Sequence, residues 1–197
     1  MTSNSKSRGT IVVSRHGKPK LDRTAGPRLD WRSYKDWWAR YEESPLRDDE
    51  FAPEVLKEAV KNADIVFASA RIRAQQTAAR AATHMDAQYD PVFNEAPLPP
   101  PLLPVVRFLP KTWNVLARTV WLCGHSLDGE SVGEARVRAA AAAVKLHDAS
   151  ENHPTVYLAA HGWFNRMLRT ELKKLGWKCV RDGGDNYWSH RTYEFPE

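Results

Sequence analysis

The chain of 197 residues has only two cysteines, Cys123 and Cys179, and it lacks long apolar runs. Two cysteines provide neither a disulfide framework nor a metal-binding spacing, so we expect a cytoplasmic protein in a reducing compartment, without a metal. No stretch approaches the roughly 18 uninterrupted apolar residues of a membrane span, and no membrane association is expected. Residues 1–9 are polar and lack the apolar segment of a secretory signal, which predicts a flexible N-terminal tail.

A large excess of charge of one sign is also missing. With 29 basic and 24 acidic residues the net charge is +5 at pH 7, and the basic residues are scattered among the acidic ones. Nucleic-acid-binding proteins usually gather their basic residues on one face, so no nucleic-acid partner is expected. A locally positive cleft for an anionic small molecule explains the charge equally well.

The order of apolar and amphipathic segments predicts an α/β fold. A first strand starts at residue 11, and further strands are predicted over 64–68, 91–95, 155–160 and 187–195. Helices are predicted over 30–41, 53–62, 72–84, 111–122, 132–148 and 163–175. This alternation favours a three-layer αβα sandwich with a mostly parallel central sheet, in a single domain over residues 10–197.

Two segments are unusual in composition and are expected near the ligand site. The helix predicted within residues 30–43, capped by Asp30, carries aromatic residues at helical spacing, which usually face a core. Residues 97–110 contain six prolines and can be neither a regular helix nor a central strand. Because they also contain many apolar residues, we expect an ordered surface crossing or lid rather than a disordered linker.

Basic side chains follow several of the predicted strands. Arg15 and His16 follow the first strand, Arg73 lies in the first turn of the helix after the second, and His161 follows the fourth. Carboxyl ends of parallel strands meet at one edge of a sheet, where open α/β sheets bind their ligands. Two arginines and two histidines gathered there need an anion, and a phosphoryl group matches guanidinium geometry best.

These motifs resemble those of the histidine phosphatase superfamily, the phosphoglycerate mutase-like proteins. Arg15-His16-Gly17 resembles the family's signature, and residues 69–78 match its second block, Ser-x-x-x-Arg-Ala-x-Gln-Thr-Ala. Gly129-Glu130-Ser131 is similar to its Gly-Glu-Ser block, and Ala160-His161-Gly162 to its late His-Gly. A turn and a helix cap explain the residues around Glu130 adequately. The blocks occur in the family's order over most of the chain.

The resemblance implies a phosphomonoesterase that uses His16 as the nucleophile and needs no metal or other cofactor. Arg15, Arg73 and His161 would hold the phosphoryl oxygens together with His16, and Glu95, after the predicted third strand, is the candidate general acid. Further candidate substrate contacts are Gly17, Lys18, Ser69, Arg71 and Gly162. Lys18 and Arg71 depart from the family's usual residues and add positive charge, so a multiply anionic substrate is possible. The expected partner is a phosphorylated small molecule or phosphate ion, bound by a monomer or homodimer.

Three other functions compete with this interpretation. A phosphoglycerate mutase-type transferase would keep the phosphohistidine and return the phosphoryl group to another hydroxyl. A non-catalytic module would only bind phosphorylated ligands. Residues 120–129 resemble the nucleophile elbow of esterases, with Ser126 as nucleophile, although Asp128 stands where that elbow needs a small residue and the preceding segment is predicted to be helical.

Overall fold

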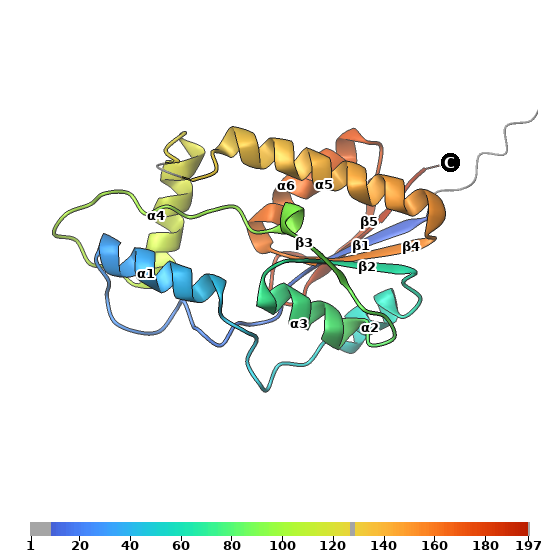
Figure 1. Ribbon diagram of the computed structural model, residues 1–197, viewed down its shortest axis with the longest axis horizontal. Coiled ribbons are helices and arrows are strands. Elements are labelled where there is room, and N and C mark those ends of the chain that lie inside the picture. The colour runs from blue at the N-terminus through green and yellow to red at the C-terminus, as the bar shows by residue number, and fades with distance from the viewer. Residues whose placement is uncertain (1–8, 127–128, 197) are drawn as a thin grey trace, which may run out of the picture.

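The computed structural model describes residues 9–126 and 129–196. Its centre is a six-stranded sheet in the order β3-β2-β4-β1-β6-β5 (Figure 1). The strands are β1 (Thr10–Arg15), β2 (Ile65–Ser69), β3 (Gln88–Asp90), β4 (Thr155–Ala160), β5 (Lys178–Asp182) and β6 (His190–Glu194). The pairs β3–β2, β2–β4 and β4–β1 are parallel, whereas β6 runs antiparallel to both β1 and β5.

Helices cover both faces of this sheet. The helices are α1 (Trp31–Glu42), α2 (Glu54–Val60), α3 (Ile72–Ala81), α4 (Pro110–Leu122), α5 (Val132–Asn152) and α6 (Gly162–Lys174). One core lies between the sheet and the pair α5 and α6, and a second core lies between the sheet and α2 and α3 (Figure 1). The predicted three-layer sandwich with a mostly parallel sheet is therefore confirmed.

The aromatic helix and α4 lie beside one end of the sheet rather than on either face (Figure 1). They enclose a third apolar core, which is built mainly from aromatic rings of α1 and from Trp113 of α4. Asp30 caps α1 as predicted, because its side chain accepts a hydrogen bond from the backbone N–H of Ser33 at 2.9 Å. Residues 97–109 form neither helix nor strand apart from an isolated bridge between Leu29 and Phe108. We call α1, α4 and residues 97–109 the cap.

The predicted third strand over residues 91–95 is wrong. The strand ends at Asp90, and Pro91–Phe93 forms a single turn of 3₁₀ helix. The reason is local: the Asp90 side chain accepts a hydrogen bond from the backbone N–H of Val92 at 2.8 Å, and Pro91 suits the first position of a helical turn.

The C-terminal hairpin also differs from the prediction. A single strand over 187–195 was expected, but β6 begins at His190, because Trp188 has a positive φ of 64° that breaks an extended chain. Strand β5 was not predicted at all. All five of its residues are exposed, so it carries no alternation of apolar and polar residues to reveal a strand.

The ends of the other elements shift by a few residues. Helix α5 runs to Asn152 and starts at the predicted capping box, in which the side chains of Ser131 and Glu134 each bond the other's backbone N–H.

Of the proposed tail, residues 1–8 lie outside the described part of the chain. Among the helices that the structure describes, none is long and apolar enough to cross a membrane.

Candidate active site

The carboxyl ends of three neighbouring strands bring the predicted site residues together. In the sheet, β4 lies between β2 and β1, so the residues that follow these strands share one edge. The backbone N–H of His16 continues the ladder beyond β1 by donating to Ala160 O at 2.9 Å. As a result the rings of His16 and His161 meet edge to face, with their centroids 5.1 Å apart.

The hydrogen bonds of His16 fix its tautomer. Its Nδ1 lies 2.7 Å from the carbonyl oxygen of Gly17, which can only accept, and its Nε2 lies 3.4 Å from Arg73 Nε, which can only donate. Nδ1 therefore carries the proton and Nε2 carries a lone pair. An imidazole with one nitrogen held as a donor presents the other as a nucleophile.

Both histidines are held in the neutral form. His16 is 3 % exposed and His161 is fully buried. Burial lowers the pKa of His16 well below its usual value, and the positive charges of Arg73 and Arg15 lower it further. Burial and then Arg73 likewise hold the pKa of His161 well below the usual value of a histidine.

The two arginines are held in different ways. Arg15 donates through Nη1 to Asp185 O at 2.6 Å, and its guanidinium lies over the ring of Tyr187, with Cζ 4.3 Å from the ring centroid. Arg73 is 1 % exposed and donates to the carbonyls of Tyr41 and Glu42 at 3.1 and 2.8 Å. Its Nη2 is also 2.8 Å from Oε1 of Glu42. Both cations are thus fixed in orientation beside His16.

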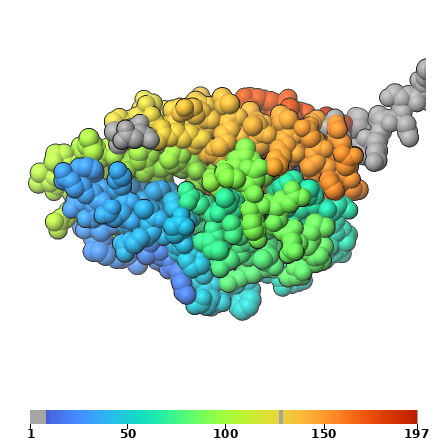
Figure 2. Space-filling view, in the orientation of Figure 1, coloured from blue at the N-terminus to red at the C-terminus, as the bar shows by residue number. Residues whose placement is uncertain are grey.

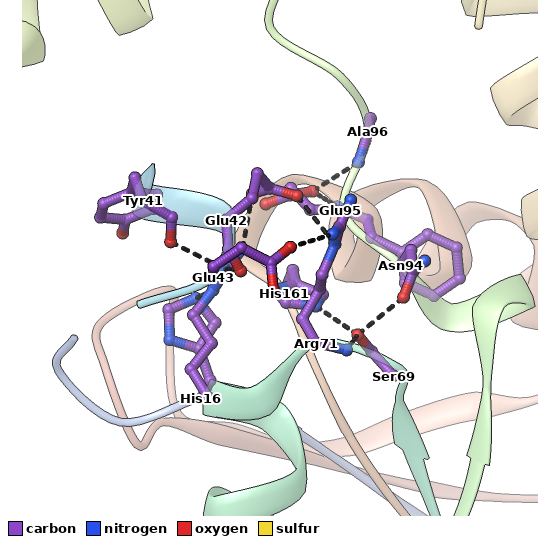
Figure 3. A network of polar contacts seen from close by, with 12 residues as sticks. His16, Tyr41, Glu42, Glu43, Ser69, Arg71, Asn94, Glu95, Ala96 and His161 are labelled. Carbon is purple, nitrogen blue, oxygen red and sulfur yellow. Dashed lines mark hydrogen bonds and ion pairs between the residues drawn. The ribbon is translucent and has the colours of Figure 1, made fainter. Parts of the chain in front are cut away.

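A chain of polar contacts orients His161 from behind (Figure 3). Its Nε2 lies 2.7 Å from Ser69 Oγ, and Ser69 in turn donates to Asn94 Oδ1 at 3.0 Å. Because the Ser69 proton is used on Asn94, Nε2 of His161 is the donor to Ser69. Nδ1 of His161 has no hydrogen-bond partner within the described residues.

Glu95 is anchored at the start of α6. Its two carboxylate oxygens accept the backbone N–H groups of Ala96, Trp163 and Phe164 at 3.0, 3.1 and 2.8 Å (Figure 3). The segment that precedes Glu95 is held by Arg138, which donates to Val92 O and Asn94 O and forms a bidentate ion pair with Glu130. Glu130 thus supports the loop that carries Glu95, in addition to preceding the α5 cap.

Two glycines allow the close packing of the site. A Cβ atom on Gly17 would lie 2.5 Å from Cε2 of Trp188, and one on Gly162 would lie 3.1 Å from Nε of Arg15. Any other residue at position 17 would displace the indole that covers the loop, and one at position 162 would press on the arginine.

A cavity of about 500 Å³ opens beside His16. The space-filling view shows a hollow where α1, in blue, meets the green segments (Figure 2). Of the residues predicted from the sequence, those that line the cavity are Arg15, His16, Arg73, Glu95 and Gly162. The aromatic helix contributes Trp38 and Tyr41, and the proline-rich segment contributes Leu98.

Five predicted site residues, Gly17 among them, stand behind or beside this cavity rather than on its wall. Ser69 and His161 are buried beneath it. Arg71 pairs with Glu42 and Glu43 at the end of α1, both at 3.0 Å. Nζ of Lys18 lies 4.0 Å from Oδ2 of Asp22, and the backbone N–H of Lys18 donates to Oε2 of Glu50 at 3.0 Å.

Several residues of the site were not singled out from the sequence. They are Arg23, Glu42, Lys111, Arg118 and Tyr187. Each reaches the site across a long stretch of chain, and none follows the carboxyl end of a predicted strand. Lys111 and Arg118 could have been found only as an excess of basic residues in α4, and Arg23 only as one of the basic residues in the loop after β1.

The esterase interpretation is wrong. Val120, Trp121 and Leu122 form the last turn of α4, whereas a nucleophile elbow needs a strand there. Ser126 follows this helix in a loop, and it does not line the cavity. Asp128, which also argued against the elbow, lies outside the described residues.

Comparison with known proteins agrees with the motifs. The family model described as "Histidine phosphatase superfamily (branch 1)" matches residues 11–188. No curated protein sequence matches the chain.

Three solved structures share the fold at low identity. A mycobacterial glucosyl-3-phosphoglycerate phosphatase with VO₃ bound is 21 % identical, with a TM-score of 0.58 over 85 % of this chain and 81 % of that one. A phosphoserine phosphatase mutant of Entamoeba histolytica in complex with phosphoserine is 17 % identical, and the match has a TM-score of 0.56 over 84 % of this chain and 80 % of that one. The ecdysone phosphate phosphatase of Bombyx mori, with tungstate, is 16 % identical, with a TM-score of 0.54 over 91 % and 82 %. The chain belongs to the histidine phosphatase superfamily, branch 1.

Proposed function

We propose that the protein is a phosphomonoesterase that transfers the phosphoryl group of its substrate to Nε2 of His16 and then to water. The observation that carries this proposal is the tautomer of His16, whose Nε2 lone pair lies on the cavity side, 3.4 Å from Nε of the fixed Arg73 guanidinium. Membership of the superfamily supports the same reaction.

In the first step the Nε2–P bond forms as the bond from phosphorus to the leaving oxygen breaks. Glu95, on the cavity wall, is the general acid that supplies the proton to that oxygen. Arg15 and Arg73 stabilise the charge on the phosphoryl oxygens. Nδ1 of His161 would join them only when it carries a proton. In the second step water attacks phosphorus, Glu95 takes a proton from it, and the Nε2–P bond breaks to release phosphate.

The test is hydrolysis of 4-nitrophenyl phosphate in the presence of a chelator. We expect wild-type turnover with a chelator present, inhibition by vanadate, and a loss of about a thousandfold or more in His16→Ala. His125→Ala, which removes an exposed imidazole outside the cavity, is the matched control. Equal rates for His16→Ala and the wild type would end the proposal.

A labelling experiment separates hydrolysis from the two alternatives. When the reaction of the ³²P-labelled substrate is quenched, the protein should carry an acid-labile ³²P label, and His16→Ala should carry none. Label that passes to the hydroxyl of a second organic molecule, rather than to inorganic phosphate, would indicate a mutase. Binding of substrate without any label or turnover would indicate a non-catalytic module.

A further inference from the structure

The cavity carries more positive charge than one phosphoryl group needs. Six of the residues that line it are basic and two are acidic. Arg15 and Arg73 stand beside His16. The other four basic residues, which we call the outer cations, are Arg23, Lys111, Arg118 and Arg166.

Most of the outer cations have no acidic partner. Arg166 is paired with Asp185 at 2.9 Å, but Arg23, Lys111 and Arg118 form no ion pair with any carboxylate in the described ranges. Like charges gathered in a partly enclosed space repel one another, and this repulsion is relieved only when an anion binds among them.

One face of α4 presents two of the outer cations, Lys111 and Arg118, along the cavity wall. Lys111, Asn114, Val115, Arg118 and Leu122 recur at helical spacing, and all five line the cavity. Lys111 and Arg118 are seven residues apart, which is about 10 Å along a helix at 1.5 Å per residue. The wall is therefore long enough for an organic group in addition to the phosphoryl group, and Val115 and Leu122 offer it apolar contacts.

Lys111 and Arg23 are better placed than Arg118 to receive a second anion. The backbone N–H of Lys111 donates to Arg23 O at 2.9 Å, so the two residues adjoin. Arg23 also lies over the ring of Tyr187, the ring that Arg15 covers, with Cζ 5.6 Å from its centroid. Arg118 is less free, because its Nη2 donates to Ala96 O at 3.0 Å and its Nη1 is buried.

We infer that the natural substrate is a phosphomonoester whose leaving group carries a second anionic group, a carboxylate or a phosphate, and that Arg23 and Lys111 bind this group. The inference rests on the proposed function for the phosphoryl end of the substrate. The two residues would set specificity, since a neutral leaving group gains nothing from them.

The experiment compares matched substrates that differ in one charge. The first pair is 4-carboxyphenyl phosphate and 4-carbamoylphenyl phosphate, and the second pair is propane-1,3-diyl bisphosphate and propyl phosphate. We expect the wild type to prefer the charged member by about tenfold or more in kcat/KM, and less at high salt. The pair with the larger ratio shows whether the second group is a carboxylate or a phosphate.

The double variant Arg23→Gln, Lys111→Gln should lose most of this preference, so that the ratio within each pair falls to about twofold or less. The control Lys35→Gln removes one charge from an exposed position on α1 that does not line the cavity, and it should keep the full ratio. A wild-type ratio near one, or a ratio that the double variant leaves intact, overturns the inference while the proposed function stands.

A binding measurement keeps the inference testable if no substrate is turned over. Calorimetric titration of the same compounds into His16→Ala should give tighter binding of each charged member, and the preference should vanish when Arg23 and Lys111 are also replaced. Absence of turnover in the wild type together with this pattern would refute the proposed hydrolysis but support the anion site. Equal binding within both pairs would refute the anion site.

Discussion

At the scale of single residues, the site combines two buried imidazoles with two guanidiniums that disfavour their protonation. Burial is the main reason that the pKa values of His16 and His161 fall well below the usual value, and Arg73 adds to it in both. The same arrangement that keeps the proposed nucleophile His16 unprotonated must destabilise the folded state in acid, because the unfolded chain binds protons there that the folded chain does not bind.

We expect stability to fall as the pH drops below about 6.5, the usual value for a histidine in an unfolded chain. Above that pH neither state protonates these rings and their contribution does not change. Between pH 6.5 and 5 each buried imidazole should cost up to about 2 kcal/mol of unfolding free energy. Urea denaturation of the wild type and His161→Asn at both pH values measures this loss.

The loss of unfolding free energy between pH 6.5 and 5 should be smaller in His161→Asn than in the wild type, by the contribution of the one buried imidazole that the variant lacks. His125→Asn, which removes an exposed ring outside the cavity, should lose as much stability as the wild type. An identical loss in His161→Asn and the wild type would mean that His161 accepts a proton in the folded state, contrary to its buried position.

The residues at strand ends could be predicted from the sequence, whereas their supports could not. A β-branched run that ends in Arg15-His16-Gly17 carries its own signal, since strand and turn propensities are local. Glu42 and Tyr187 meet Arg73 and Arg15 only through the fold, and no pattern of neighbouring residues marks such a contact.

At the scale of elements, the end of α1 and the start of α3 hold each other in place. Arg73 donates to the carbonyls of Tyr41 and Glu42 at the end of α1, where the Tyr41 carbonyl also accepts the backbone N–H groups of Glu43 and Ser44. The Glu42 carboxylate lies 2.8 Å from Arg73 and 3.0 Å from Arg71. The candidate phosphate-binding arginine therefore also caps the helix that walls the cavity.

Replacing Glu42 by glutamine should lower the unfolding free energy by about 2 kcal/mol and raise KM several-fold, because a buried guanidinium loses its counter-charge and its fixed orientation. The matched control is Glu43→Gln, whose side chain is 75 % exposed, against 12 % for Glu42. Exposed pairs contribute little, so this change should stay within about 0.5 kcal/mol. Equal effects in the two variants would show that Glu42 does not position Arg73. Chemical denaturation and steady-state kinetics measure both quantities.

The central strands of the sheet could be predicted from the sequence, whereas its edge strands could not. Buried central strands such as β1 and β4 show as apolar runs, because both of their faces meet helices. The edge strands β3 and β5 are short or exposed and carry no such run. These errors did not affect the predicted positions of the basic site residues, because only β1, β2 and β4 place them. Glu95, in contrast, follows a 3₁₀ turn rather than a strand.

At the scale of the whole molecule, α1 has a core apart from the sheet, whereas Trp121 near the end of α4 packs with Ala135 of α5 in a fourth core. The aromatic core of α1 and α4 shares no buried residue with the two cores beside the sheet. The cavity lies between them and takes its walls from both, with Tyr41 and Arg118 on the cap side and Arg15 and Gly162 at the sheet edge. A ligand bound there would tie the two parts together.

Hydrogen exchange should therefore show two levels of stability. Elements with separate cores open separately, so amides of α1 should exchange at least about tenfold faster than those of β1 and β4. Vanadate, bound between Arg15 and Arg73, should slow exchange in α1 much more than in the sheet, because Arg73 caps that helix. In Glu42→Gln the effect of vanadate on α1 should shrink, since one link between the arginine and the helix is gone. Exchange of α1 and the sheet at one common rate, unchanged by vanadate, would mean that they unfold as one unit and that ligand binding is not coupled to α1.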